Sequence, residues 1–139
     1  NVFGLVGGDA NAIAPRKTPL SSMTPTIVTE NGRLRLAAGA PGGSTIITQV
    51  LQIVLNVLEY KMNAGEAVSV PRIHHQWLPD ELRVEPFSLD ATTVQDLQRR
   101  GHKLKEQSPW GNGNAIVVTP DGTLEGAADP RGEGSPRGF

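Results

Sequence analysis

Apolar positions recur at helical spacing over one long segment of the chain. Between residues 46 and 58 they lie three or four positions apart, which places their side chains along one face of an α-helix. The pattern predicts a helix from about Ser44 to Tyr60, with Ser44 as a plausible N-cap. Ile53 and Val57 widen the apolar face, so we expect this helix to be buried on most sides.

Two other regions combine apolar runs with the turn residues of β-hairpins. In PTIVTENGRLRLAAG, strands near residues 25–30 and 33–38 flank Asn31-Gly32. This dipeptide is a strong hairpin signal, because a type I′ turn needs positive φ at both central residues. In NAIVVTPDGTLEGAAD, a second hairpin is expected to turn on Pro120-Asp121-Gly122.

Shorter elements are predicted between these regions. NAGEAVSVP indicates a short helix that ends before Pro71, because the residue before a proline avoids the helical region. RIHHQWLPDELRVE is predicted to be extended, with a break at Pro79-Asp80. SLDATTVQDLQRRG indicates a helix capped by Asp90 and closed by Gly101, and HKLKEQ a strand after it.

The two ends of the chain carry turn-forming and polar residues. Residues 1–18 are predicted to form a loop around GGDA, and the tail DPRGEGSPRGF is expected to be loosely held, residues 132–139 above all. The fold class that follows is α+β, with two β-hairpins, one long buried helix and shorter helices. A length of 139 residues fits one domain or a large piece of one.

Composition excludes several classes of function. The net charge is -1 and the basic residues are scattered, whereas nucleic-acid binding needs a clustered basic surface, so no nucleic-acid partner is expected. Cysteine is absent, which excludes disulfides and thiolate metal sites. No apolar run reaches the length of a membrane span.

The APGGST segment is the best local signal for chemistry. Gly42 and Gly43 lead directly into the predicted long helix, where glycine lets a ligand approach the backbone and the helix N-terminus presents amide groups and a positive dipole end. This combination suits an anion or a developing oxyanion. The alternative, which is more frequent for such a pattern, is that the glycines only turn a strand into a helix.

Ser21 and Ser22 in PLSSM raise a second question of chemistry. A nucleophilic role is disfavoured, since there is no G-x-S-x-G motif and no lysine three residues after either serine. Adjacent hydroxyl and amide groups are better suited to holding a carboxylate. A polar turn before a strand is the simpler alternative.

The remaining polar residues are interpreted as structural. His74 and His75 are neighbours on an extended segment, so their imidazoles point to opposite faces and cannot chelate one metal ion. Each is expected to form local hydrogen bonds and to pack against a neighbour such as Trp77. Asp129 is expected to be a turn or ion-pair residue, and Arg131 in ADPR to pair with a carboxylate at the end of the last strand.

Three long motifs in order resemble one family. NVFGLVGGDANAIAPRKTPLSSMTPTIV, APGGSTIITQVLQIV and PRIHHQWLPDELRVE are similar to the small subunit of gamma-glutamyltransferase (gamma-glutamyl transpeptidase), over nearly the whole chain. The resemblance implies an N-terminal nucleophile hydrolase with a four-layer αββα sandwich. It also implies a self-cleaving precursor, whose new N-terminal threonine attacks the gamma-glutamyl amide of glutathione or a related compound, forming an acyl-enzyme that water or an amino-acid or peptide acceptor resolves.

The resemblance also assigns roles to individual residues. The family's carboxylate-binding serines fall on Ser21 and Ser22, and its oxyanion-hole glycines fall on Gly42 and Gly43. The nucleophilic threonine of a Thr-Thr-His-type stretch has no match here, because Thr92-Thr93 lies in a predicted helix. Residues 1–139 are therefore expected to be the C-terminal portion of a small subunit, a single incomplete domain that is inactive alone and pairs with a large subunit and the rest of its own subunit.

Two alternatives of other kinds stay open at this point. One is a non-catalytic binding or assembly module derived from the family, and the other is a related acylase of the cephalosporin type, although the serine pair favours gamma-glutamyl substrates. No cofactor and no metal are implied. The resemblance implies a periplasmic or secreted location.

Overall fold

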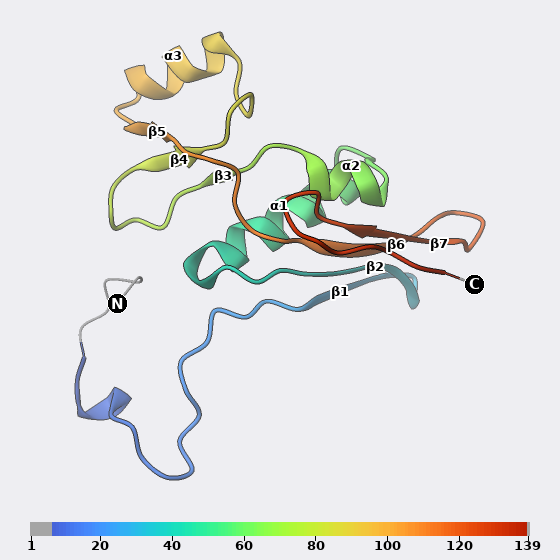
Figure 1. The fold of residues 1–139 in the computed structure, drawn as a ribbon, viewed down its shortest axis with the longest axis horizontal. Helices are drawn as coiled ribbons and strands as arrows, with labels where there is room; N and C mark the ends of the chain where they lie inside the picture. Colours follow the sequence, from blue (N-terminus) through green and yellow to red (C-terminus); the bar gives the residue numbers. More distant parts are fainter. Residues whose placement is uncertain (1–6, 139) are drawn as a thin grey trace.

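Two antiparallel hairpins joined edge to edge form the main sheet (Figure 1). The computed structural model describes residues 7–138. The sheet has the strand order β1-β2-β6-β7. Its strands are β1 (Thr26–Glu30), β2 (Arg33–Gly39), β6 (Asn114–Val118) and β7 (Leu124–Ala128). Both predicted hairpins are confirmed, and the first turns through Asn31 and Gly32 with φ of 52° and 75°.

A smaller sheet and three helices complete the described part of the chain. The small sheet pairs β3 (Ile73–His74) antiparallel to β4 (Leu82–Val84) and β4 parallel to β5 (Leu104–Glu106). The helices are α1 (Ile46–Leu58), α2 (Ala64–Ser69) and α3 (Ala91–Arg99), with 3₁₀ turns η1 (Asp9–Asn11) and η2 (Gly43–Thr45). These elements confirm the α+β class. No helix within residues 7–138 is long and apolar enough to cross a membrane.

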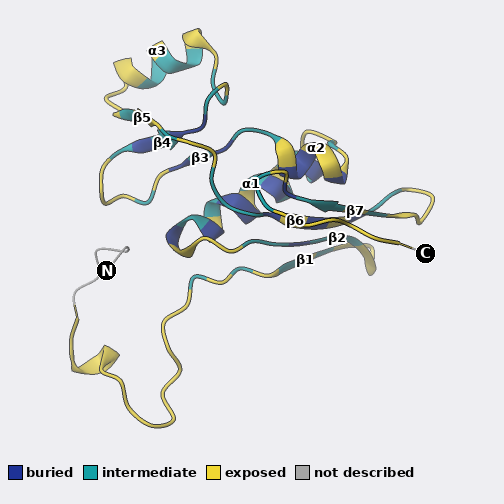
Figure 2. Ribbon diagram, in the orientation of Figure 1, coloured by how far each residue is buried: buried dark blue, intermediate teal, exposed yellow. Residues whose placement is uncertain are grey.

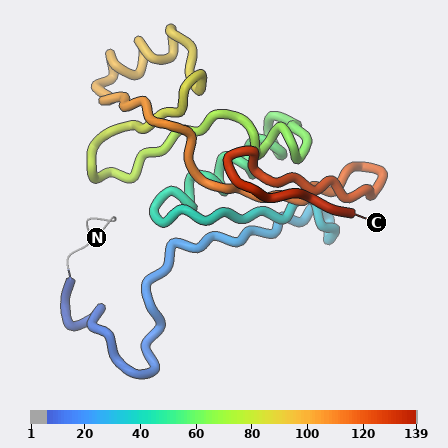
Figure 3. Tube along the Cα trace, in the orientation of Figure 1, coloured from blue at the N-terminus to red at the C-terminus, as the bar shows by residue number. Residues whose placement is uncertain are grey.

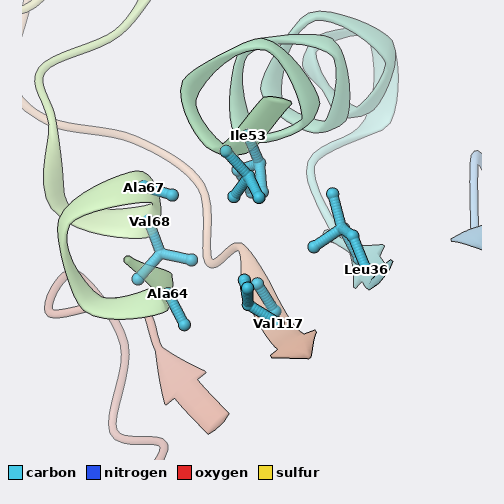
Figure 4. Close-up of a cluster of buried hydrophobic side chains, with 9 residues drawn as sticks. Leu36, Ile53, Ala64, Ala67, Val68 and Val117 are labelled. Atoms are coloured by element: carbon cyan, nitrogen blue, oxygen red, sulfur yellow. The ribbon is translucent and has the colours of Figure 1, made fainter. Parts of the chain in front are cut away.

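The hydrophobic core lies between one face of the main sheet and the helices α1 and α2 (Figure 4). In register across β2 and β6, Leu36 pairs with Val117 and Ala38 with Ala115, so all four side chains point to this face. They meet Ile53, which is 1% exposed. The rest of this cluster comprises Val57, Ala64, Ala67 and Val68.

The other face of the main sheet is open. One cross-strand row of this face consists of Ile27, Ala37, Ile116 and Gly126. Because this row is displaced by one residue from the core positions, it is directed away from the helices. Ile27 is 73% exposed. Part of this face and the C-terminal segment around Pro136 border a groove of about 550 Å³.

The long helix differs from its prediction in two respects. Ser44 is not the N-cap, because the chain first makes the η2 turn and α1 begins at Ile46 with Thr45 as the capping residue. The helix is also not buried on most sides. Its outer stripe of Ile47, Leu51 and Leu55 stays exposed (Figure 2), since these residues lie four positions apart on the face turned away from the sheet.

The shorter helices and extended segments follow their predictions. Helix α2 ends at Ser69, before Pro71, and begins with a capping box between Asn63 and Glu66. Helix α3 is capped by Asp90, whose carboxylate accepts a hydrogen bond from the amide of Thr93 at 2.9 Å. The extended segment is broken between β3 and β4, as expected.

The two ends of the chain behave differently from each other. Residues 7–18 run away from the body of the molecule (Figure 3) and are exposed, as predicted for a loop, whereas residues 1–6 of that prediction lie outside the described residues. At the other end the prediction of a loose tail is wrong for its first residues. Asp129 is only 1% exposed and the Arg131 side chain 11%, because both belong to a buried ionic cluster.

Four charged residues form that cluster: Arg72, Glu85, Asp129 and Arg131. Arg72 pairs with Asp129, and Arg131 bridges Asp129 and Glu85. Burial acts to raise the pKa of the Asp129 carboxyl, but hydrogen bonds from the amides of Arg131 and Gly113 and from Arg72 outweigh it and hold that pKa below its usual value. The predicted ion pairing of Asp129 and Arg131 is confirmed.

The ionic cluster also holds the backbone of the segment before β6. Glu85 accepts a hydrogen bond from the Trp110 amide at 2.9 Å, and the Arg72 guanidinium donates to the Trp110 carbonyl at 2.8 Å. Asp129 accepts from the Gly113 amide at 2.7 Å. The cluster therefore joins α2, β4, the 110–113 segment and the chain after β7.

Substitution Arg72→Met should test this cluster. It removes a guanidinium that partners a buried carboxylate and two backbone carbonyls, so we expect a loss of about 3–5 kcal/mol in unfolding free energy. The matched control is Arg99→Met, which removes an exposed ion pair with Asp96 and should change stability little. Urea denaturation of the protein that carries this segment measures both, and equal losses would contradict the role of the cluster.

Candidate functional site

The two segments singled out in the sequence, PLSSM and APGGST, meet at one end of the first hairpin. Thr26 at the start of β1 pairs with Ala38 near the end of β2, so the chain before β1 and the chain after β2 leave the sheet side by side. The Ser22 hydroxyl donates a hydrogen bond to the Gly43 carbonyl at 2.8 Å. The structure thus brings Ser22 to the glycine turn.

The glycine turn has a backbone shape that favours glycine. Gly42 has φ of 140° and Gly43 has φ of 59°, conformations that residues with a Cβ rarely adopt. The Gly42 carbonyl accepts hydrogen bonds from the Thr45 amide at 3.2 Å and the Thr45 hydroxyl at 2.9 Å. Both glycines are exposed, and the turn leads through η2 into α1.

This turn can serve as an anion site for a physical reason. The first residues of a helical segment have no preceding turn whose carbonyls could accept hydrogen bonds from their amides. Those amides, together with the positive end of the α1 dipole, favour negative charge at this point. The geometry is therefore compatible with an oxyanion at Gly42 and Gly43.

The space beside Gly42 is filled on its inner side. A Cβ atom at Gly42 would lie 2.6 Å from the Thr45 hydroxyl and 2.7 Å from the Gln49 side-chain nitrogen. Gln49 is fully buried, and its Nε2 donates to the Pro41 carbonyl at 3.1 Å and to the Thr45 hydroxyl at 2.8 Å. The turn is packed against a polar group inside the protein and exposed on its other side.

The two serines have different surroundings. Ser21 is exposed, and its hydroxyl oxygen accepts a hydrogen bond from the Met23 amide at 3.1 Å, which leaves its proton for another acceptor. Ser22 is half-buried and directs its proton to the Gly43 carbonyl. Ser21 thus makes a local hydrogen bond, and Ser22 joins the pair to the glycine turn.

His74 forms local hydrogen bonds, as the sequence predicts. His74 is 2% exposed, with its Nδ1 2.7 Å from the Thr48 hydroxyl and its Nε2 2.9 Å from the Gln76 side-chain oxygen. Burial lowers the pKa of His74, and the neighbouring positive charge of Arg83 adds to this. Among residues 7–138, no group of three or more His, Cys, Asp or Glu residues is arranged to hold a metal ion.

The surroundings of His75 depart from their prediction. His75 is exposed and stacks edge-on with His102, at 6.5 Å between ring centroids, rather than with the largely exposed Trp77 ring. Its local hydrogen bonds are as expected: Nε2 lies 3.4 Å from Asp80, and Nδ1 accepts from the Trp77 amide at 3.2 Å.

Sequence reasoning missed Gln49 and Thr45. Gln49 contacts the glycine turn from inside the protein, and the half-buried Thr45 bonds the Gly42 carbonyl. A signal for Gln49 was present, because it lies three residues after Ile46 and four before Ile53 on the apolar face of α1. A lone amide on such a face needs buried hydrogen-bond partners.

Comparison with known proteins gives a consistent result. The family model described as gamma-glutamyltranspeptidase matches residues 1–139. The chain is 56% identical over 132 residues to a glutathione hydrolase proenzyme of Escherichia coli, covering 94% of this chain and 22% of that relative. The chain thus spans about a fifth of the length of that curated relative.

A solved structure agrees with this result, and an acylase is among the more distant relatives. The crystal structure of a Helicobacter pylori gamma-glutamyltranspeptidase T380A mutant superposes with a TM-score of 0.86 at 50% identity, over 95% of this chain and 73% of that one. The chain is also 37% identical over 130 residues to an acylase ACY 1 proenzyme of a Pseudomonas species, covering 93% of this chain and 23% of that protein.

The pair Gly42→Ala and Gly43→Ala tests the packing of the turn. Gly42→Ala places a Cβ against Thr45 and Gln49 at a φ of 140°, so we expect a loss of roughly 2–5 kcal/mol in unfolding free energy. At Gly43 no atom of residues 7–138, apart from its own chain neighbours, lies within 4 Å of the added Cβ, so only the strain of a φ of 59° remains, about 1–2 kcal/mol. Chemical denaturation compares the two variants, and an equal or larger loss for Gly43→Ala would contradict this geometry.

Proposed function

The chain belongs to the gamma-glutamyltranspeptidase family, and from this premise we propose that it is part of an enzyme that transfers or hydrolyses the gamma-glutamyl group of glutathione and related compounds. The observation that carries the proposal is the hydrogen bond between Ser22 and the Gly43 carbonyl. It joins a potential carboxylate-binding pair to a potential oxyanion turn. A gamma-glutamyl substrate carries both a carboxylate and a reacting carbonyl, so it needs both features.

The proposed reaction is acyl transfer through a threonine that lies outside these 139 residues. The threonine oxygen bonds to the gamma-carbonyl carbon, and the carbonyl oxygen becomes an oxyanion that the amides of Gly42 and Gly43 stabilise. Collapse of this intermediate breaks the amide bond, and the amine leaves with the proton that the threonine hydroxyl released. Water or the amino group of an acceptor amino acid or peptide then attacks the gamma-glutamyl ester and frees the threonine.

Ser21 and Ser22 are proposed to bind the α-carboxylate of the gamma-glutamyl group. The Ser21 hydroxyl accepts from the Met23 amide and can direct its own proton to a carboxylate oxygen. Ser22 would rotate its hydroxyl from the Gly43 carbonyl to do the same. The position of Ser22 beside Gly43 would place the carboxylate end of the substrate next to the oxyanion turn.

The proposed partners are a large subunit and the rest of the small subunit, in a four-layer αββα sandwich. Two exposed apolar surfaces support this proposal. One is the row containing Ile27 and Ile116 on the open face of the main sheet, and the other is the stripe of Ile47, Leu51 and Leu55 on α1. In such a sandwich a second sheet covers the first surface and another element covers the second.

An acylase of the cephalosporin type is the second candidate, favoured by the 37% identity to an acylase proenzyme. An acylase shares the need for an oxyanion turn, but its acyl group need not carry an α-carboxylate and amine. The ratio of kcat/KM for a gamma-glutamyl anilide to that for a glutaryl anilide separates the two.

We also propose a periplasmic or secreted location, on the basis of the family resemblance.

The isolated chain is expected to be inactive. It supplies the turn and the serines but not the threonine, so the purified 139-residue chain should not release the chromophore from a gamma-glutamyl anilide. The complete protein should do so under the same conditions. Turnover by the isolated chain would contradict the assigned roles, and a complete protein that binds glutathione without turning it over would indicate a binding module instead.

Substitutions Ser21→Ala and Ser22→Ala in the complete protein test the carboxylate site. Each removes one hydrogen bond to a charged group, worth about 1.5–3 kcal/mol, so KM for a gamma-glutamyl anilide should rise roughly tenfold or more while kcat changes less. Ser69→Ala is the matched control, since its exposed hydroxyl bonds only the Gly65 carbonyl in the described structure. Loss of kcat at unchanged KM would instead indicate that the serines act in the chemical step.

A further inference from the structure

We propose that Gln49 is the positioning residue of the oxyanion turn, acting through the peptide planes of Gly42 and Gly43. The inference rests on the proposed function, because it assigns a task to those two amides. Gln49 does not contact the substrate side of the turn. It acts from inside the protein, on carbonyl groups that share a plane with the amides.

The first plane is the peptide bond between Pro41 and Gly42. The Gln49 side-chain nitrogen donates to the Pro41 carbonyl at 3.1 Å. Since a trans peptide is planar, its C=O and the following N–H point in opposite directions. Holding the Pro41 carbonyl toward Gln49, inside the protein, therefore holds the Gly42 amide away from it.

The second plane is the peptide bond between Gly42 and Gly43. The Gln49 nitrogen also donates to the Thr45 hydroxyl at 2.8 Å, and that hydroxyl donates to the Gly42 carbonyl at 2.9 Å. By the same planarity, the Gly43 amide is directed away from Thr45. One amide group of Gln49 thus orients both donors of the proposed oxyanion hole.

Packing leaves Gln49 little freedom to move. Its side chain is fully buried, and a Cβ atom added at Gly42 would lie only 2.7 Å from its side-chain nitrogen. On its other side, a Cβ at Gly111 would overlap with the Gln49 side-chain oxygen. The neighbouring Trp110 backbone is held by Glu85 and Arg72 of the ionic cluster, so the side chain lies between the turn and a fixed loop.

The chemistry of Gln49 favours a positioning task over a purely structural one. Both hydrogens of its side-chain amide are used at the turn. Its side-chain oxygen is buried and has no hydrogen-bond partner within residues 7–138. An unpartnered buried carbonyl destabilises a fold, and an apolar residue of similar length would avoid that cost. Gln49 is therefore placed for its two donors.

The main test compares Gln49→Met with Gln52→Met in the complete protein. Methionine keeps the length of the side chain and removes the amide. Gln52 lies on the same helix, and its amide bonds Thr48 and Ile73 rather than the turn. For Gln49→Met, kcat on a gamma-glutamyl anilide should fall about tenfold to hundredfold with KM nearly unchanged, less than the loss expected from deleting an oxyanion donor. For Gln52→Met, kcat should be unchanged.

A second readout separates positioning from general loss of structure. A boronic acid analogue of glutamate becomes tetrahedral when the nucleophile binds it, and so reports on the oxyanion hole, whereas free glutamate reports on the ground-state site. Gln49→Met should weaken the boronate by the same factor as kcat and leave glutamate binding unchanged. Equal weakening of both ligands would overturn the proposal.

A pair of variants at Thr45 guards against misfolding of Gln49→Met. Thr45→Val removes the hydroxyl that links Gln49 to the Gly42 carbonyl, and Thr45→Ser keeps it. The valine variant should lose kcat, by about tenfold, and the serine variant should retain it. Equal activity of the two variants would contradict the claim that the Thr45 hydroxyl orients the peptide plane between Gly42 and Gly43.

The proposed function and this inference fail in distinguishable ways. If the unsubstituted complete protein does not act on gamma-glutamyl compounds, the proposed function is wrong. A crystal structure of Gln49→Met still decides the positioning role, because a rotated Pro41–Gly43 backbone supports it and an unchanged backbone overturns it. If the unsubstituted protein is active and Gln49→Met matches Gln52→Met in kcat, only the positioning role is wrong.

Discussion

The buried ionic cluster of Arg72, Glu85, Asp129 and Arg131 is the constraint on which the rest of the structure depends. Its two guanidinium groups and two carboxylates balance in charge, and backbone groups satisfy their remaining hydrogen-bond capacity. Such a cluster adds less stability than its short distances suggest, because desolvation opposes the attraction between the charges. Its importance is geometric. Each buried charge is neutralised only by its native partners, so the four side chains must keep their positions relative to one another.

The geometry of the cluster reaches the glycine turn through a short series of contacts. The cluster holds the Trp110–Gly113 backbone, and that backbone confines the Gln49 side chain. Gln49 in turn holds the carbonyls on the inner side of the turn, while Ser22 holds the Gly43 carbonyl from the other motif. Each step fixes a backbone plane, so a site made of amide groups can be rigid although its glycines are exposed and intrinsically flexible.

Local patterns in the sequence predicted the elements better than their environment. The Asn31-Gly32 turn, the Asp90 cap and the end of α2 before Pro71 depend on residues close together in the chain, and all three are confirmed. The prediction that α1 is buried on most sides was wrong, because periodicity identifies the apolar faces of a helix but not what covers them. The tail was also misjudged, since two of the groups that hold Arg131, the Glu85 carboxylate and the Val68 carbonyl, lie 46 and 63 residues away in the sequence.

The candidate site shows the same division between local and distant information. Gly42 and Gly43 are recognisable from APGGST, because a glycine pair before a helix has a local physical meaning. The orientation of their peptide planes is not recognisable from that motif. It comes from Gln49, a buried residue in the first turn of α1 that lies seven residues after Gly42. A polar residue on an apolar helix face is the one sequence feature that reveals such support. In a site made of backbone amides, the side chains that orient the amides lie behind the turn, where no motif of reactive groups marks them.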